Sequence, residues 1–322
     1  MLIRTRSAAL TAVLAAGLLT AGTTATAGAA PPPYKVKTNH RTLTIAARAA
    51  GDGLALRLAP GDPQTLQVDV GGDGTADYSV ARSRFDRIAV AAGSGNNRVV
   101  IDESNGAFTT DTPTTIDGEA GNDTITGGSG NETLLGGDGN DFVDAGRGAD
   151  VVDTGAGDDT FLWNPGQGSD TFEGGAGNDK MVFNGAAGAE KFGVSANGTR
   201  VRFTRDLGGI VMDLHGVERI DTNVLAGADS VAVGNLAGTD TSEVAVNLGA
   251  VDGVVDQVNV DGTALNDSIA AGGTATRATV TGLAAQVDIT GAALAEDRLA
   301  ISGLAGNDLL IGGAGINTLV QD

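Results

Sequence analysis

A carboxylate recurs at one position of a nine-residue unit in the middle of the chain. Seven units run from residue 118 to 182, with glycine at the fourth position and a large apolar residue at the eighth position of every unit. Three matched columns over seven units indicate a structural repeat. The sixth position is acidic throughout, at Asp123, Glu132, Asp141, Asp150, Asp159, Asp170 and Asp179.

Carboxylates spaced in this way among glycines suit a hard cation that binds oxygen. Ca²⁺ takes six to eight oxygen ligands at about 2.3–2.6 Å without strict geometry, and tight turns can supply backbone carbonyls beside each carboxylate. Mg²⁺ prefers a smaller octahedral shell and retains its water. Transition metals favour His or Cys, and the chain has only His40 and His215 and no Cys. The repeat therefore predicts several Ca²⁺ sites.

The unit also predicts the elements that position these carboxylates. Three residues around the apolar eighth position form a short strand whose central side chain points inward. Glycine tolerates positive φ, so the remaining six residues can reverse the chain in a tight turn. Two units then make one coil with a turn on each side. The expected fold class is all-β, a parallel β-roll or β-solenoid flanked by less regular solenoid-like segments.

Because successive units alternate sides, carboxylates on one side of the roll are two units apart. A two-residue insertion at Trp163 and Asn164 should lengthen one link without exchanging the sides. One predicted row contains Asp123, Asp141, Asp159 and Asp179, and the other contains Glu132, Asp150 and Asp170. Block 118–182 has thirteen acidic and two basic residues, so we expect it to be disordered without a cation. The alternative is an acidic disordered linker, but a linker would not explain why the eighth position of every unit is apolar.

These repeats resemble the glycine-rich nonapeptides of the RTX, or hemolysin-type, calcium-binding family, whose pattern is Gly-Gly-x-Gly-x-Asp-x-apolar-x. The resemblance covers residues 118–182 and 303–320, and the flanks are similar to those of secreted bacterial members without a toxin or enzyme domain. It implies that turn carbonyls and sixth-position aspartates bind calcium, at Asp123, Asp141, Asp150, Asp159, Asp170, Asp179 and Asp308. Glu132 and Asn317 depart from the pattern and stand outside this ligand set.

Composition divides the chain into five segments. We expect a signal peptide at 1–29, a β-rich flank at 30–117, the calcium-binding β-roll at 118–182, a degenerate solenoid-like region at 183–302 and RTX-type repeats at 303–322. In the degenerate region four aspartates keep the spacing between the sixth and eighth positions without most of the glycines, namely Asp229, Asp256, Asp267 and Asp297.

The first residues have the organisation of a secretory signal peptide. Arg4 and Arg6 precede an apolar stretch, and small residues permit cleavage after Ala27 or Ala29. The apolar stretch is short for a bilayer span, so secretion is favoured over a membrane anchor. The lack of Cys excludes disulfides and thiolate chemistry. A formal net charge of −20 argues against nucleic acid and anionic membranes as partners.

A second candidate calcium loop lies before the repeats. It contains Asp69, Asp73 and Asp77 around a glycine pair. It lacks the third-position oxygen and the late glutamate of an EF-hand. A plain hairpin turn is therefore the favoured interpretation of this segment.

No catalytic motif stands out among the residues. The expected function is that of a secreted calcium-binding repeat protein that folds on binding extracellular Ca²⁺, with a non-enzymatic structural or surface-interaction role. Its expected partners are calcium ions and a cell-envelope or polysaccharide surface. The alternative is a β-helix-type polysaccharide-cleaving enzyme with calcium as a structural ion, since parallel β-helices can carry paired carboxylates.

Overall fold

The computed structural model describes residues 34–47, 51, 53–250, 252–274, 276–291, 297–312 and 318–320. The predicted signal peptide at 1–29 and Asn317 lie outside these residues. The described part consists of β-strands and two short 3₁₀ turns, η1 (Arg82–Arg84) and η2 (Leu207–Gly209). It contains no helix that is long and apolar enough to cross a membrane.

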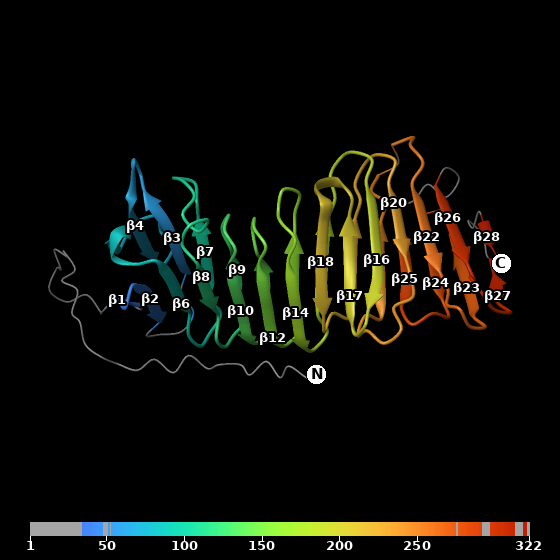
Figure 1. Ribbon diagram of the computed structural model, residues 1–322, viewed down its shortest axis with the longest axis horizontal. Coiled ribbons are helices and arrows are strands. Elements are labelled where there is room, and N and C mark those ends of the chain that lie inside the picture. The colour runs from blue at the N-terminus through green and yellow to red at the C-terminus, as the bar shows by residue number, and fades with distance from the viewer. Residues whose placement is uncertain are drawn as a thin grey trace.

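The strands form two long sheets that stack along the length of the molecule, as Figure 1 shows. In the order of hydrogen bonding, the first sheet contains β1 (Tyr34–Asn39), β2 (Thr42–Ala47), β6 (Arg87–Ala91), β8 (Thr114–Asp117), β10 (Thr133–Asp138), β12 (Val151–Ala156), β14 (Thr171–Ala176), β18 (Ile210–His215), β17 (Arg200–Arg205), β16 (Lys191–Asn197), β20 (Ser230–Val233), β22 (Gln257–Asp261), β26 (Arg298–Ser302) and β28 (Thr318–Val320). The second contains β27 (Leu309–Ile311), β23 (Ser268–Gly273), β24 (Arg277–Thr281), β25 (Gln286–Thr290), β21 (Glu243–Asn247), β19 (Arg219–Asn223), β15 (Lys180–Asn184), β13 (Thr160–Trp163), β11 (Phe142–Asp144), β9 (Thr124–Thr126), β7 (Arg98–Asp102), β3 (Gly53–Ala59), β4 (Asp62–Val70) and β5 (Tyr78–Ala81).

Within the glycine-rich block, strands pair in parallel with the strand two units later. Leu134 pairs with Val152 in the first sheet, and Val143 pairs with Phe161 in the second. Each coil therefore consists of two nine-residue units, as predicted. After the insertion the register lengthens to 20 residues, with Val152 opposite Phe172, and each row stays in its own sheet. The predicted parallel β-roll is confirmed.

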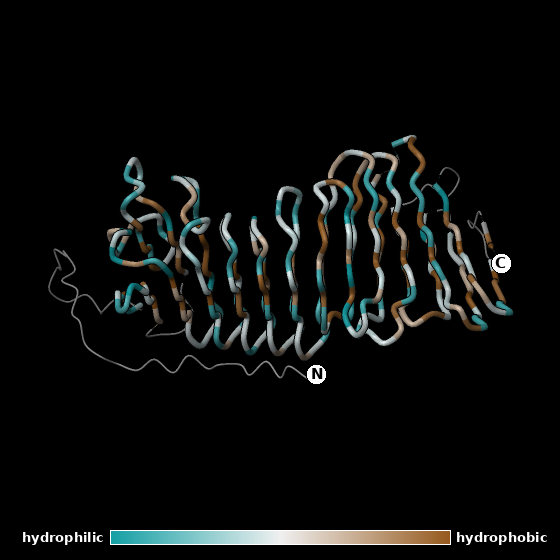
Figure 2. The backbone as a smooth tube through the Cα atoms, in the orientation of Figure 1, coloured by the Kyte–Doolittle hydropathy of each residue, from teal (hydrophilic) through white to brown (hydrophobic). Residues whose placement is uncertain are grey.

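The inward side chains form one continuous core between the sheets. All seven eighth-position residues of the block are completely buried, at Ile125, Leu134, Val143, Val152, Phe161, Phe172 and Met181. Their neighbours along each strand are partly or fully exposed, and Figure 2 shows this alternation of apolar and polar residues along the strands. Period-two burial is what a sheet packed on one face requires.

Both sheets continue through the described residues on each side of the block. Antiparallel excursions interrupt the coils there: β3, β4 and β5 form a meander, and β17 lies antiparallel between β16 and β18. A further excursion joins β23, β24 and β25. The flanks are thus less regular solenoid segments whose coils differ in length.

Candidate calcium-binding turns

The sixth-position carboxylates lie in the turns immediately before the strands, and they are buried. Asp141 is 3% exposed and Asp179 is completely buried. The others in the block are buried to a similar degree, at Asp123, Glu132, Asp150, Asp159 and Asp170. Removing a carboxylate from water is costly unless it is hydrogen-bonded and its charge is compensated. The environment of each oxygen atom therefore decides what these residues can do.

In each of the six aspartates of the block, one carboxylate oxygen links neighbouring coils. Asp141 Oδ1 accepts the backbone N–H of Asp123 at 2.7 Å, and Asp159 Oδ1 accepts that of Asp141 at 2.7 Å. Asp179 Oδ1 continues this row by accepting the N–H of Asp159 at 2.9 Å. On the other side, Glu132 and Asp150 donate their N–H groups to Asp150 Oδ1 at 2.7 Å and Asp170 Oδ1 at 2.9 Å. The two rows are those predicted from the repeat.

The other oxygen of each carboxylate is buried and has no hydrogen-bond partner within the described structure. This is true of one oxygen in all seven residues: Asp123, Glu132, Asp141, Asp150, Asp159, Asp170 and Asp179. A buried polar atom without a partner costs about 1–3 kcal/mol, and more if it is charged. Seven such atoms in register indicate that a group absent from the polypeptide completes the turns.

Two first-position glycines, Gly118 and Gly136, each leave an oxygen-lined space beside the free carboxylate oxygen of their unit. A Cβ atom added to Gly118 would lie 2.3 Å from Asp123 Oδ2 and 2.5 Å from the carbonyl oxygen of Gly136 in the next coil. A Cβ on Gly136 would likewise lie 2.3 Å from Asp141 Oδ2 and 2.6 Å from the carbonyl oxygen of Thr154. The carboxylate and the carbonyl of the next coil thus face one small space, as a cation site requires.

Burial raises the pKa values of these carboxyl groups and outweighs their backbone hydrogen bonds, while neighbouring carboxylates in the same row add to the effect. The pKa is raised to about 6 for Asp123, about 7 for Asp141 and about 8 for Asp150. For Asp170 and Asp179 it is raised to about 6 and about 7. Full ionisation of both rows near neutral pH is therefore unfavourable without positive charge.

The available ligand atoms are those that calcium prefers. Carboxylate and carbonyl oxygens surround the spaces, and these oxygens suit Ca²⁺. No cluster of three or more His, Cys, Asp or Glu side chains with metal-site geometry occurs in the described part of the chain. That finding agrees with the repeat design, because each turn contributes one carboxylate and backbone oxygens must complete the shell. The residues present fit calcium.

The structure also places residues that the predicted ligand set left out. Glu132 occupies the same position as the aspartates, and its Oε2 accepts the N–H of Gly128 at 2.8 Å. Glu218 ends the longer row, because its Oε2 accepts the N–H of Asp179 at 2.6 Å. No repeat pattern marks Glu218 in the sequence, so only the folded chain could find it. Asp308 lies apart from the block, where its Oδ1 accepts the N–H of Asp267 at 2.9 Å.

A second, outer ladder braces the turns and was not predicted. Asn122 Oδ1 accepts the N–H of Asn140 at 3.0 Å, and Asn140 Oδ1 accepts that of Asp158 at 3.0 Å. Asp158 Oδ1 in turn accepts the N–H of Asn178 at 2.9 Å. The signal was present in the fifth column of the repeat, where Asn and Asp predominate. These side chains hold the turns in register around the inner row.

The loop with Asp69, Asp73 and Asp77 is a hairpin connection, as favoured from the sequence. Asp69 Oδ2 accepts from Arg57 Nη1 at 2.8 Å and from the N–H of Gly74 at 2.9 Å. Asp77 Oδ2 accepts the N–H of Val70 at 2.7 Å. Both carboxylates are thus used to hold the β4–β5 connection.

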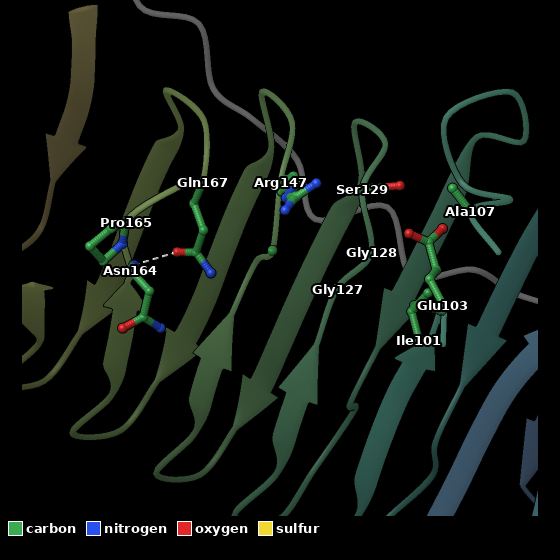
Figure 3. A pocket seen from close by; sticks show the side chains of 12 residues that line it. Ile101, Glu103, Ala107, Gly127, Gly128, Ser129, Arg147, Asn164, Pro165 and Gln167 are labelled. Atoms are coloured by element: carbon green, nitrogen blue, oxygen red, sulfur yellow. Dashed lines mark hydrogen bonds between the residues drawn. The ribbon is translucent and has the colours of Figure 1, made fainter. Parts of the chain in front are cut away.

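A groove with a volume of about 500 Å³ lies across the turns on the Glu132 side. Figure 3 shows Glu103 and Ala107 on one side, Asn164, Pro165 and Gln167 on the other, and Ser129 and Arg147 between them. Glu103 is the single carboxylate among the lining residues, and its Oε1 accepts the N–H groups of Phe108 and Thr109 at 2.8 and 3.0 Å. The groove's carboxylate is therefore engaged in holding its own loop.

Comparison with known proteins agrees with this geometry. The family model described as the RTX calcium-binding nonapeptide repeat matches four stretches of the chain, at residues 109–143, 126–161, 166–187 and 301–319. No curated protein matches the chain. The matched stretches contain both rows of buried carboxylates and Asp308. The chain therefore contains RTX-type calcium-binding repeats in these stretches.

Proposed function

We propose that this is a secreted protein whose roll folds when it binds several extracellular Ca²⁺ ions, and that its role is structural or surface-interacting and not enzymatic. The observation that carries the proposal is the set of seven buried carboxylates, each with one oxygen that has no hydrogen-bond partner. In the six aspartates of this set the other oxygen accepts an N–H group of the neighbouring coil. The predicted ligands are Asp123, Asp141, Asp150, Asp159, Asp170, Asp179 and Asp308, with Glu132 as an addition suggested by its position.

The expected binding energy is large enough to control folding. Extracellular calcium modules bind with dissociation constants of about 10⁻⁴–10⁻³ M. At ten times that concentration one site adds about 1.4 kcal/mol to the free energy of unfolding. Several sites together add on the order of 10 kcal/mol, which is comparable to the whole stability of a domain. Calcium binding and folding of the block are then one event.

The decisive experiment is a calcium titration of the full mature chain followed by circular dichroism and limited proteolysis. Millimolar Ca²⁺ should produce a β-sheet signal and protect residues 118–182, and a chelator should reverse both effects. Mg²⁺ at the same concentration should do much less, because it keeps its water and prefers an octahedral shell. A spectrum and a cleavage pattern that ignore calcium would refute the proposed function.

Secretion is tested separately on the producing cell. Protein recovered from the culture medium should begin at Gly28 or Ala30 by mass spectrometry, as the small residues before these positions predict. Recovery of the full-length chain in the membrane fraction would contradict export.

The non-enzymatic role is a prediction to be tested against the alternative, a polysaccharide-cleaving enzyme with paired carboxylates. Glycoside hydrolysis commonly uses a pair. Incubation with acidic polysaccharides should release no new chain ends, and pull-downs on the cell envelope should retain the protein in calcium. Calcium-dependent cleavage of a polysaccharide would overturn this part of the proposal.

A further inference from the structure

A third ladder of carboxylates lies in the degenerate region, outside the stretches that match the repeat model. Asp229 Oδ1 accepts the backbone N–H of Glu190 at 2.9 Å, and the N–H of Asp229 donates to Asp256 Oδ1 at 2.9 Å. The N–H of Asp256 donates to Asp297 Oδ1 at 3.0 Å. The distances and the donor–acceptor pattern are those of the glycine-rich block.

The turn before Asp229 has the backbone of a repeat turn although it keeps a single glycine. Leu225 and Gly227 have φ angles of 70° and 123°. The equivalent Glu119 and Gly121 in the first repeat have φ angles of 71° and 124°. Positive φ is uncommon for a residue such as leucine, so the stacking of neighbouring coils must enforce it. At these two positions the turn therefore has the φ angles of a repeat turn.

Asp229 also has the free oxygen of a repeat carboxylate. Its side chain is 2% exposed, and its Oδ2 is buried without a hydrogen-bond partner in the described structure. Burial, followed by the nearby carboxylates of Asp256, Glu190 and Asp252, raises its pKa to about 7. Asp252 is tied to the same turn, because its Oδ2 accepts the N–H of Gly227 at 3.0 Å.

Glu190, in the preceding coil of this ladder, shows how the chain neutralises a buried carboxylate when it uses its own cation. Arg205 Nε donates to Glu190 Oε1 at 2.6 Å, and both side chains are buried. The N–H of Ala186 donates to the other oxygen, Oε2, at 2.7 Å. Glu190 is thus satisfied within the protein. No Lys or Arg of the described residues forms an ion pair with Asp229.

We propose that Asp229 and Asp256, together with carbonyl oxygens of their turns, form a further Ca²⁺ site outside the glycine-rich repeats. This inference rests on the proposed function, since it assigns to a degenerate turn the ion that the repeat turns bind. Its consequence is that calcium orders the second half of the roll directly, through its own site, as well as through contact with block 118–182.

Hydrogen–deuterium exchange of the full mature chain, with and without Ca²⁺, tests the site locally. In the unmodified protein, calcium should slow exchange in residues 224–233 by at least about tenfold, alongside block 118–182. Asp229→Asn keeps the Oδ1 acceptor and removes the charge, so it should clearly reduce the slowing at 224–233 and leave the response of the block unchanged. Asp256→Asn, which removes the second carboxylate, should have the same effect. Equilibrium dialysis with radioactive calcium should count one ion fewer in either variant.

The matched control is Asp213→Asn, which removes an exposed charge that is paired with Arg200 Nε at 2.6 Å. It should preserve the calcium response of both regions and the ion count. The inference is refuted if 224–233 responds equally in Asp229→Asn, or if the ion count is unchanged in both variants. If block 118–182 of the unmodified protein also ignores calcium, the proposed function itself fails, so the two failures are distinguishable.

Discussion

Replacing Asp141 by Asn should stabilise the calcium-free fold and reduce the stability that the protein gains from calcium. Asn retains an oxygen that can accept the N–H of Asp123, the contact that measures 2.7 Å with Asp141 Oδ1, but it has no charge. Without calcium the change removes a carboxylate whose pKa burial has raised to about 7 from 3.8. Since one pKa unit is about 1.4 kcal/mol, ionising this group in the folded state at pH 8 costs up to about 4 kcal/mol, which the variant avoids.

With calcium the advantage of the variant becomes smaller. The variant loses a ligand, and a site filled to ten times its dissociation constant contributes about 1.4 kcal/mol. We therefore expect Asp141→Asn to fold more readily in chelator and to gain less stability from calcium than the unmodified chain does. Circular dichroism at pH 8 measures both effects. Folding of the calcium-free chain is followed in a titration with an osmolyte that favours compact states, and the effect of calcium is followed in a calcium titration.

The row arrangement adds a second measurement on the same variant. The N–H of Asp141 donates to Asp159 Oδ1 in the same row, whereas Asp150 belongs to the opposite row. Combining Asp141→Asn with Asp159→Asn should give a coupling of about 0.5–3 kcal/mol, and combining it with Asp150→Asn should be nearly additive. The exposed Asp138, changed to Asn, is the control for loss of charge alone. Equal coupling in both pairs, or an equal gain in stability from calcium in the variant and in the unmodified chain, would refute the reasoning.

Three further outcomes follow from the same geometry. Without calcium the β-sheet signal should grow as the pH falls from 8 to 4. Carboxyl groups with raised pKa values, such as Asp150 at about 8, stabilise the fold when they are protonated and lose that contribution as the pH rises. A fall in the β-sheet signal on acidification would contradict this prediction. Gly118→Ala should raise the calcium midpoint at least about tenfold, since its Cβ would meet Asp123 Oδ2 and a carbonyl oxygen. Gly188→Ala, with open space around its Cβ position, should leave the midpoint unchanged in the same titration. Glu132→Asp should keep or lower the midpoint, because it restores the ligand of the other repeats.

The sequence by itself determined the roll in block 118–182. The nine-residue period predicts that one coil contains two units. The apolar residues at the eighth position predict the core, and the acidic residues at the sixth position predict the two rows of carboxylates. These inferences succeed because every coil has nearly the same length, so spacing in sequence equals position in space. Even the insertion at Trp163 obeys this rule, since it adds residues to one turn while Phe161 and Met181 still pair across the 20-residue step.

Only the tertiary structure decided how the carboxylate oxygens are used and which distant residues join the rows. Glu218 lies 39 residues from its partner Asp179, and Asp256 lies 27 residues from Asp229. The β16–β17 hairpin separates the first pair and longer loops separate the second, so no fixed period marks these residues. Hydrogen bonding between neighbouring strands restores the stacking regardless of loop length, and this places Glu190 beside Arg205 and leaves Asp229 with a free oxygen. Spacing in sequence describes a solenoid only where its coils are equal; elsewhere, strand pairing decides which side chains meet.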